Sequence, residues 1–176
     1  MTGLWLFTGL VVLVGLERVA ELVVSLRNAR WSFARGGIEH GRRHYPPMVL
    51  LHTGLLVGAL VEAWVRRPSV PPVLAGAMLG LVLLSQVLRW WCIVTLGRQW
   101  NTRVIVVPGL PAVGRGPYRW LSHPNYAAVV VEGFALPLVH AAWITALVFT
   151  VLNAALLIVR LRVETAALRT LSTGAP

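Results

Sequence analysis

Five long apolar runs constrain the fold of this chain more than any other feature of its sequence. The runs cover residues 3–26, 47–65, 72–95, 124–139 and 142–160. A helix of roughly 20 apolar residues is long enough to cross the hydrocarbon core of a bilayer. Hydrophobic residues make up 57% of the chain and charged residues 12%, which excludes an ordinary soluble domain. We therefore predict an all-α integral membrane protein, with five transmembrane helices in one domain over residues 1–176.

The connections between the last runs are also informative. Only residues 140–141 separate the fourth run from the fifth, so these two should form a tight helical hairpin of antiparallel neighbours. Before them, residues 96–123 hold a short β-branched run that is broken by repeated proline and glycine residues. Such a segment is typical of an ordered loop with turns, and functional residues are frequent in loops.

Arginine is distributed unequally between the two sets of connections. Arg66 and Arg67 alone follow the second run, whereas twelve arginines follow the first run, follow the third run or end the fifth. The twelve are Arg27, Arg30, Arg35, Arg42, Arg43, Arg98, Arg103, Arg115, Arg119, Arg160, Arg162 and Arg169. The positive-inside rule then predicts a protein of the cytoplasmic membrane, with its N-terminus outside and its C-terminus in the cytoplasm. The positive-inside rule accounts for the net charge of +10, because the arginines set the orientation of the chain in the membrane. We therefore predict no nucleic-acid partner.

A layer of polar residues lies near the predicted cytoplasmic ends of the runs, within roughly 14 Å at 1.5 Å per residue. Its members are Glu17, Arg18, Glu21, His52, Arg89, Glu132 and Asn153. Ionisable groups at this depth are costly unless they are paired or hydrated, so they mark a functional site by default. We predict a cytoplasmic active site in this layer.

Several members of this layer also have a structural interpretation. Arg18 and Glu21 are three residues apart and can form an ion pair on one helix face. His52 can be a hydrogen-bonded helix contact, and Asn153 can bridge the last two helices, as membrane amides often do. Both interpretations stay open at this point.

Outside this layer, we expect structural roles. Glu62 precedes Arg66 by four residues, which predicts a surface ion pair. His40 and His44 have helical spacing, but no cysteine or carboxylate cluster joins them, so we predict no metal site. Tryptophans near the predicted cytoplasmic ends fit an aromatic belt; they are Trp90, Trp91, Trp100 and Trp120.

The stretch GPYRWLSHPNY, followed by a hairpin and then RLRVETAAL, resembles the isoprenylcysteine carboxyl methyltransferase family of membrane enzymes. The pattern of that family is a GxY turn, then RHPxY, then RxxxEE at the end of the last helix. The matching residues are Gly116 and Tyr118, then His123, Pro124 and Tyr126, then Arg160 and Glu164. Ser122 and Thr165 depart from the pattern. The resemblance covers residues 96–168, and the N-terminal part is similar to bacterial members that resemble alkylpyrone and alkylresorcinol O-methyltransferases.

The resemblance implies a binding site for S-adenosylmethionine at the cytoplasmic face. The residues implied to bind it are Leu110, Val113, Tyr118, His123, Pro124, Asn125, Tyr126 and Glu164. Glu164 can accept hydrogen bonds from ribose hydroxyls or the ammonium group. His123 and Asn125, at a helix N-terminus, can hold the carboxylate.

The implied reaction is methyl transfer to a lipophilic acceptor that arrives from the membrane lipids. The family assigns Arg160 to the acceptor side. A phenol or enol with a pKa of about 10 must lose its proton, which makes Glu132 or His52 the candidate general base. A carboxylate acceptor, as in isoprenylcysteine methylation, needs no base. A small transporter or scaffold without enzymatic activity is the alternative from another class.

Overall fold

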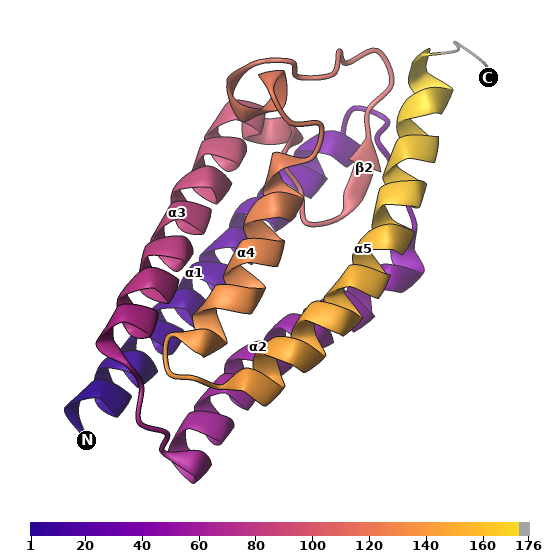
Figure 1. Ribbon diagram of the computed structural model, residues 1–176. Helices are drawn as coiled ribbons and strands as arrows, with labels where there is room; N and C mark the ends of the chain where they lie inside the picture. Colours follow the sequence, from indigo (N-terminus) through magenta and orange to yellow (C-terminus); the bar gives the residue numbers. More distant parts are fainter. Residues whose placement is uncertain (173–176) are drawn as a thin grey trace.

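The computed structural model describes residues 1–172. Within them the chain forms five α-helices and a two-stranded sheet, as Figure 1 shows. The helices are α1 (Thr2–Phe33), α2 (Tyr45–Arg66), α3 (Pro72–Leu96), α4 (Pro124–Leu138) and α5 (Trp143–Ser172). They alternate in direction, so the N-terminus of α1 and the end of α5 lie at opposite ends of the bundle (Figure 1). The predicted α-helical fold is confirmed, and α1 and α5 extend well beyond the predicted runs.

Among residues 1–172, three helical segments are long and apolar enough to cross a membrane. They are Arg42–Arg66, Pro72–Gln99 and Trp143–Ala167. The fourth helix, α4, has 15 residues with Pro137 near its end, as expected from the shortest apolar run. That α1 and α4 also cross, and the direction of crossing, stay predictions.

Small residues bring the helices together at the end of the bundle away from the long loop. Ala59 and Ala63 on α2 are fully buried, and the first half of α1 packs over them. This core consists of Leu4, Phe7, Val11, Val14, Ala59, Ala63, Val82, Ala135 and Leu136. Large apolar side chains elsewhere on the helices point outward, which suits contact with lipid.

The predicted hairpin of α4 and α5 is confirmed, and its two helices approach closely at Gly133. A Cβ atom on Gly133 would lie 1.9 Å from Cε1 of Phe149, so a larger residue there would force the helices apart. The start of α5 is held by Glu62 of α2, which accepts hydrogen bonds from the backbone N–H groups of Ile144 at 3.1 Å and Thr145 at 2.8 Å. Glu62 therefore caps α5, a role beyond its predicted pair with Arg66, which is also present at 3.0 Å.

The loop before the hairpin contains a strand that the sequence analysis did not predict. β2 (Val104–Val106) pairs antiparallel with β1 (Ile38–His40), which lies between α1 and α2. The β-branched residues of β2 favour extended backbone, and Val104 and Val106 pack with Ala167 of α5. The strand thereby attaches the loop to the last helix.

Candidate active site

Two adjoining cavities lie at the end of the bundle where this loop folds. The outer cavity, of about 260 Å³, is lined by the loop and by α5. The inner cavity, of about 150 Å³, lies between the helices. Both are lined by Trp100, Asn125, Tyr126 and Arg160. A ligand in one cavity can therefore meet a ligand in the other at these side chains.

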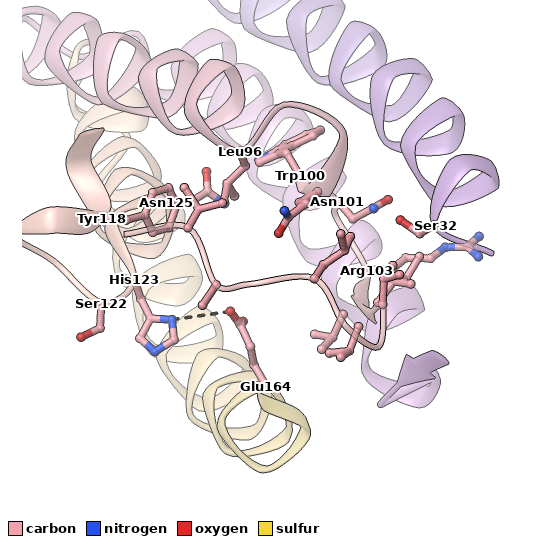
Figure 2. Close-up of a pocket in the computed structure, with 18 of the residues that line it drawn as sticks. Ser32, Leu96, Trp100, Asn101, Arg103, Tyr118, Ser122, His123, Asn125 and Glu164 are labelled. Carbon is pink, nitrogen blue, oxygen red and sulfur yellow. Dashed lines mark ion pairs between the residues drawn. The ribbon is translucent and has the colours of Figure 1, made fainter. Parts of the chain in front are cut away.

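The outer cavity collects nearly all the residues that the sequence analysis assigned to the cofactor. Those that line it are Leu110, Val113, Tyr118, His123, Asn125, Tyr126 and Glu164. Pro124 does not line it and instead begins α4. Figure 2 shows His123 and Glu164 facing one another, with Nδ1 and Oε1 separated by 3.7 Å. Ser122, the departure from the family pattern, also lines this cavity.

Tyr126 connects the two charged residues of the last motif. Arg160 Nε donates a hydrogen bond to the Tyr126 hydroxyl at 2.8 Å, and that hydroxyl donates to Glu164. The His123 ring stacks on the Tyr126 ring, with centroids 5.4 Å apart. Arg160 and Glu164 are four residues apart on α5, so they share one helix face. Four motif residues thus form one continuous network: His123, Tyr126, Arg160 and Glu164.

Gly116 explains how Tyr118 reaches this cavity. The backbone at Gly116 has a φ of +59°, and a Cβ atom would lie 2.5 Å from the Thr95 hydroxyl. Only glycine allows the short turn Gly116–Arg119 to lie this close to the end of α3. Burial raises the pKa of the Tyr118 phenol, so this group stays neutral and can donate a hydrogen bond.

Trp100, Asn101 and Arg103 are among the residues of the outer cavity that were not identified from the sequence. Trp100 was expected in an aromatic belt, but only 3% of it is exposed, which corrects that interpretation. Asn28 of α1 positions this segment by donating hydrogen bonds to the carbonyls of Gly97 and Trp100. Because the contact joins segments far apart in sequence, no local pattern could have revealed it.

The chemistry of these residues fits S-adenosylmethionine, which carries a carboxylate, an ammonium group, ribose hydroxyls and an adenine. Trp100 Nε1, Asn101 Nδ2 and Asn125 Oδ1 are buried and have no hydrogen-bond partner in the described part of the chain. They offer two donors and one acceptor at the cavity. Arg103 adds a cation, and Glu164 adds an anion.

The inner cavity has an apolar wall with a few polar groups. Met48, Val49, Leu56, Val129 and Leu157 supply the apolar part, and His52 and Asn153 are among the polar residues. Val49 and Thr53, one turn apart on α2, both line the cavity and are both exposed. The cavity therefore reaches the outside of the bundle beside α2.

His52 is held in one orientation inside this cavity. Its Nδ1 atom lies 2.8 Å from the carbonyl oxygen of Met48, and its ring contacts the ring of Phe149 edge-on. A carbonyl only accepts hydrogen bonds, so Nδ1 carries the proton and Nε2 keeps a lone pair. The predicted helix contact is present, and it leaves His52 able to accept a proton.

Glu132 is placed differently from the expectation. It is 5% exposed and is not among the residues that line either cavity. Its Oε2 atom lies 2.9 Å from Arg89 and 3.4 Å from Arg18, and both arginines line the inner cavity. The predicted pair of Arg18 and Glu21 is also present at 2.8 Å. Glu132 therefore does not line the inner cavity itself, whereas its partners Arg89 and Arg18 do.

Comparison with known proteins agrees with this arrangement. The model of the isoprenylcysteine carboxyl methyltransferase family matches residues 78–170, more than half of the chain. The chain belongs to this family. Enzymes of the isoprenylcysteine carboxyl methyltransferase family use S-adenosylmethionine. The match includes every motif residue of the outer cavity and leaves out α1 and α2, which supply much of the inner cavity.

Two bacterial relatives are similar over most of their length. An uncharacterized protein of Bacillus subtilis, YpbQ, is 35% identical over 164 residues, which are 93% of this chain and 97% of the relative. An uncharacterized protein of Haemophilus influenzae is 25% identical over 154 residues, which are 86% and 88% of the two chains. No solved structure matches the chain.

Proposed function

We propose that the protein is an integral membrane methyltransferase that uses S-adenosylmethionine to O-methylate a lipophilic phenol or enol, such as an alkylresorcinol or alkylpyrone. The observation that carries this proposal is the pair of adjoining cavities with Trp100, Asn125, Tyr126 and Arg160 between them. One cavity suits a charged cofactor, and the other suits an apolar acceptor. Methyl transfer needs the two to be held in line, and such positioning supplies much of the rate.

In this proposal the outer cavity binds the cofactor, which supplies an electrophilic methyl group. Glu164 accepts hydrogen bonds from the ribose or the ammonium group, and Arg103 with the N–H groups of Trp100 and Asn101 holds the carboxylate. Leu110 and Val113 are apolar walls for the adenine. The predicted orientation, with arginine-rich loops in the cytoplasm, gives this cavity access to the cytoplasmic pool of cofactor.

The inner cavity binds the ring of the acceptor. A cavity of about 150 Å³ accommodates a benzene ring, and the opening beside Val49 leaves an alkyl chain in the lipid. The resemblance to bacterial members that are similar to alkylpyrone and alkylresorcinol O-methyltransferases supports the same acceptor class.

His52 is the proposed general base, and Arg160 stabilises the oxygen that becomes charged. His52 lines the inner cavity and keeps a lone pair on Nε2, whereas the Glu132 carboxylate does not line it and is paired with Arg89 and Arg18. These placements support His52 over Glu132. A carboxylate acceptor, as in isoprenylcysteine methylation, would not need this base.

Binding of S-adenosylhomocysteine tests the cofactor site and separates the enzyme from a transporter or scaffold. We expect saturable binding by calorimetry to the purified protein, and a loss of at least about tenfold in affinity for Glu164→Ala, because a charge-assisted hydrogen bond is removed. Arg162→Ala is the matched control: it removes an exposed charge from the same turn of α5 and should keep the affinity. Unchanged affinity of Glu164→Ala would remove this residue from the site, and absence of binding to the unaltered protein would contradict the proposed function.

A further inference from the structure

The inner cavity is bounded on one side by a buried ionic network. Arg18, Glu21 and Arg89 belong both to this network and to the cavity lining. Its charged members are Glu17, Arg18 and Glu21 of α1, Arg89 of α3 and Glu132 of α4. Three carboxylates therefore face two guanidinium groups, and three of their buried polar atoms, Glu21 Oε1, Arg18 Nε and Arg89 Nε, have no hydrogen-bond partner within the described residues 1–172.

Two of the three carboxylates, those of Glu132 and Glu17, accept hydrogen bonds from side chains of the protein. Glu132 Oε2 accepts from Arg89 at 2.9 Å. Glu17 accepts from Gln86, and also from Trp90 at 2.5 Å. These contacts account for Glu17 and Glu132 without any ligand.

Glu21 is the exception. Its Oε2 atom accepts from Arg18 at 2.8 Å, but its Oε1 atom has no hydrogen-bond partner in the described part of the chain. The nearest donor is Arg89 Nε at 3.6 Å, which is too long for a hydrogen bond. Only 4% of Glu21 is exposed, so solvent does not satisfy this oxygen. A buried acceptor without a donor is costly, and this one belongs to a residue that lines the inner cavity.

We propose that Glu21 Oε1 accepts a hydrogen bond from a second hydroxyl group of the methyl acceptor, and that the substrate class is a dihydroxylated aromatic ring with an alkyl chain. This inference rests on the proposed function. Arg18 and Arg89 lie beside this carboxylate, and an ionised carboxylate accepts hydrogen bonds but donates none. In a pyrone the second polar group is a carbonyl, whose oxygen would be an acceptor placed against the acceptor Glu21 Oε1. Glu21 thus selects a resorcinol-type ring over a monohydroxylated ring and over a pyrone.

Two acceptors that differ by one hydroxyl group test this inference: a 5-alkylresorcinol and the 3-alkylphenol with the same saturated chain. With the unaltered protein, kcat/KM should favour the resorcinol by about 10- to 100-fold after correction for its two equivalent hydroxyls, as expected for a hydrogen bond to a charged group. Glu21→Gln should reduce this preference severalfold, mainly by raising KM for the resorcinol. Glu17→Gln is the matched control, because Glu17 belongs to the same network without lining the cavity, and it should keep the preference.

The comparison in the unaltered protein does not depend on whether the variants fold. Equal kcat/KM for the two acceptors would overturn the role of Glu21 while leaving the proposed methyltransferase intact. Preference for an alkylpyrone over both would also overturn it. Turnover of none of the three, by protein that binds S-adenosylhomocysteine, would contradict the proposed acceptor class and this inference with it. Equal loss of preference in Glu17→Gln and Glu21→Gln would assign the effect to the network as a whole and overturn a specific contact with Glu21.

Discussion

At the scale of single residues, the division of roles between His52 and Glu132 is the sharpest consequence of the structure. Both were candidates for the general base, because each is an ionisable group in the same membrane layer. Sequence spacing gave no way to choose between them. The choice depends on their partners: His52 contacts the Met48 carbonyl one turn earlier on α2, whereas Glu132 pairs with Arg89 of another helix, α3.

Substitution of His52 tests this division. His52→Gln should keep the affinity for S-adenosylhomocysteine, since His52 does not line the outer cavity. It should lower turnover of a phenol by about 10²- to 10⁴-fold, the usual contribution of general base catalysis. Turnover and binding are measured on the same purified sample.

Glu132→Gln is the companion variant. It leaves Arg89 without its closest partner, and breaking a buried ion pair is strongly destabilising, so thermal unfolding in detergent should occur at a lower Tm. The folded protein should still turn over the phenol. Loss of turnover in Glu132→Gln together with full activity in His52→Gln would reverse the two assignments.

The motif residues themselves were predictable from the sequence, whereas several of their neighbours were not. Tyr118, His123, Tyr126 and Glu164 were implied by the resemblance to the family pattern, and local turn and helix geometry fixes positions only within each short motif. Asn101 reaches the cavity only because the loop folds back to α1 and α5. Such contacts depend on tertiary packing, and hydrophobic periodicity contains no information about them.

At the scale of helices and strands, apolar length located all five helices, but it did not show where they end or what holds their ends. The hairpin followed from the short connection between α4 and α5. The role of Glu62 did not, because its partners, Ile144 and Thr145, are 82 and 83 residues away in sequence. The strand β2 was missed because three β-branched residues between loops make too weak a pattern to distinguish a strand from a turn.

Removal of the Glu62 cap should weaken the start of α5. Glu62→Ala leaves the N–H groups of Ile144 and Thr145 without their acceptor, and we expect a loss of about 1 to 2 kcal/mol in the free energy of unfolding. Arg66→Ala is the control: its side chain is 53% exposed, so the ion pair contributes less than about 1 kcal/mol. Denaturant unfolding in detergent measures both. Equal losses in the two variants would assign the stabilisation to the ion pair instead of the cap.

At the scale of the whole molecule, the two long connections, residues 34–44 and 97–123, lie at the same end of the bundle (Figure 1). They hold seven arginines, and the second of them lines the outer cavity. This arrangement agrees with the arginine distribution, which predicts that this end faces the cytoplasm. A methyltransferase site needs that orientation, because S-adenosylmethionine is made in the cytoplasm.

Reporter fusions test the orientation. Alkaline phosphatase fused after Pro176 should be inactive, because this enzyme is active only outside the cytoplasm. A fusion truncated after Pro68, between α2 and α3, should be active. Activity of the Pro176 fusion would place the cavities on the wrong side for their cofactor, and would show that the number of crossings or the charge rule has failed.

The proposed reaction is tested most directly by transfer of a labelled methyl group. Purified protein in lipid vesicles is incubated with S-adenosylmethionine that carries a labelled methyl group and with a 5-alkylresorcinol, and a farnesylcysteine analogue is the rival acceptor. We predict a labelled monomethyl ether of the resorcinol, formed in proportion to time and protein, and formed much more slowly by Glu164→Ala when S-adenosylmethionine is not saturating. Two results would contradict O-methylation of a lipophilic phenol. One is label that appears only in the methyl ester of the farnesylcysteine analogue. The other is the absence of any labelled product from protein that binds S-adenosylhomocysteine.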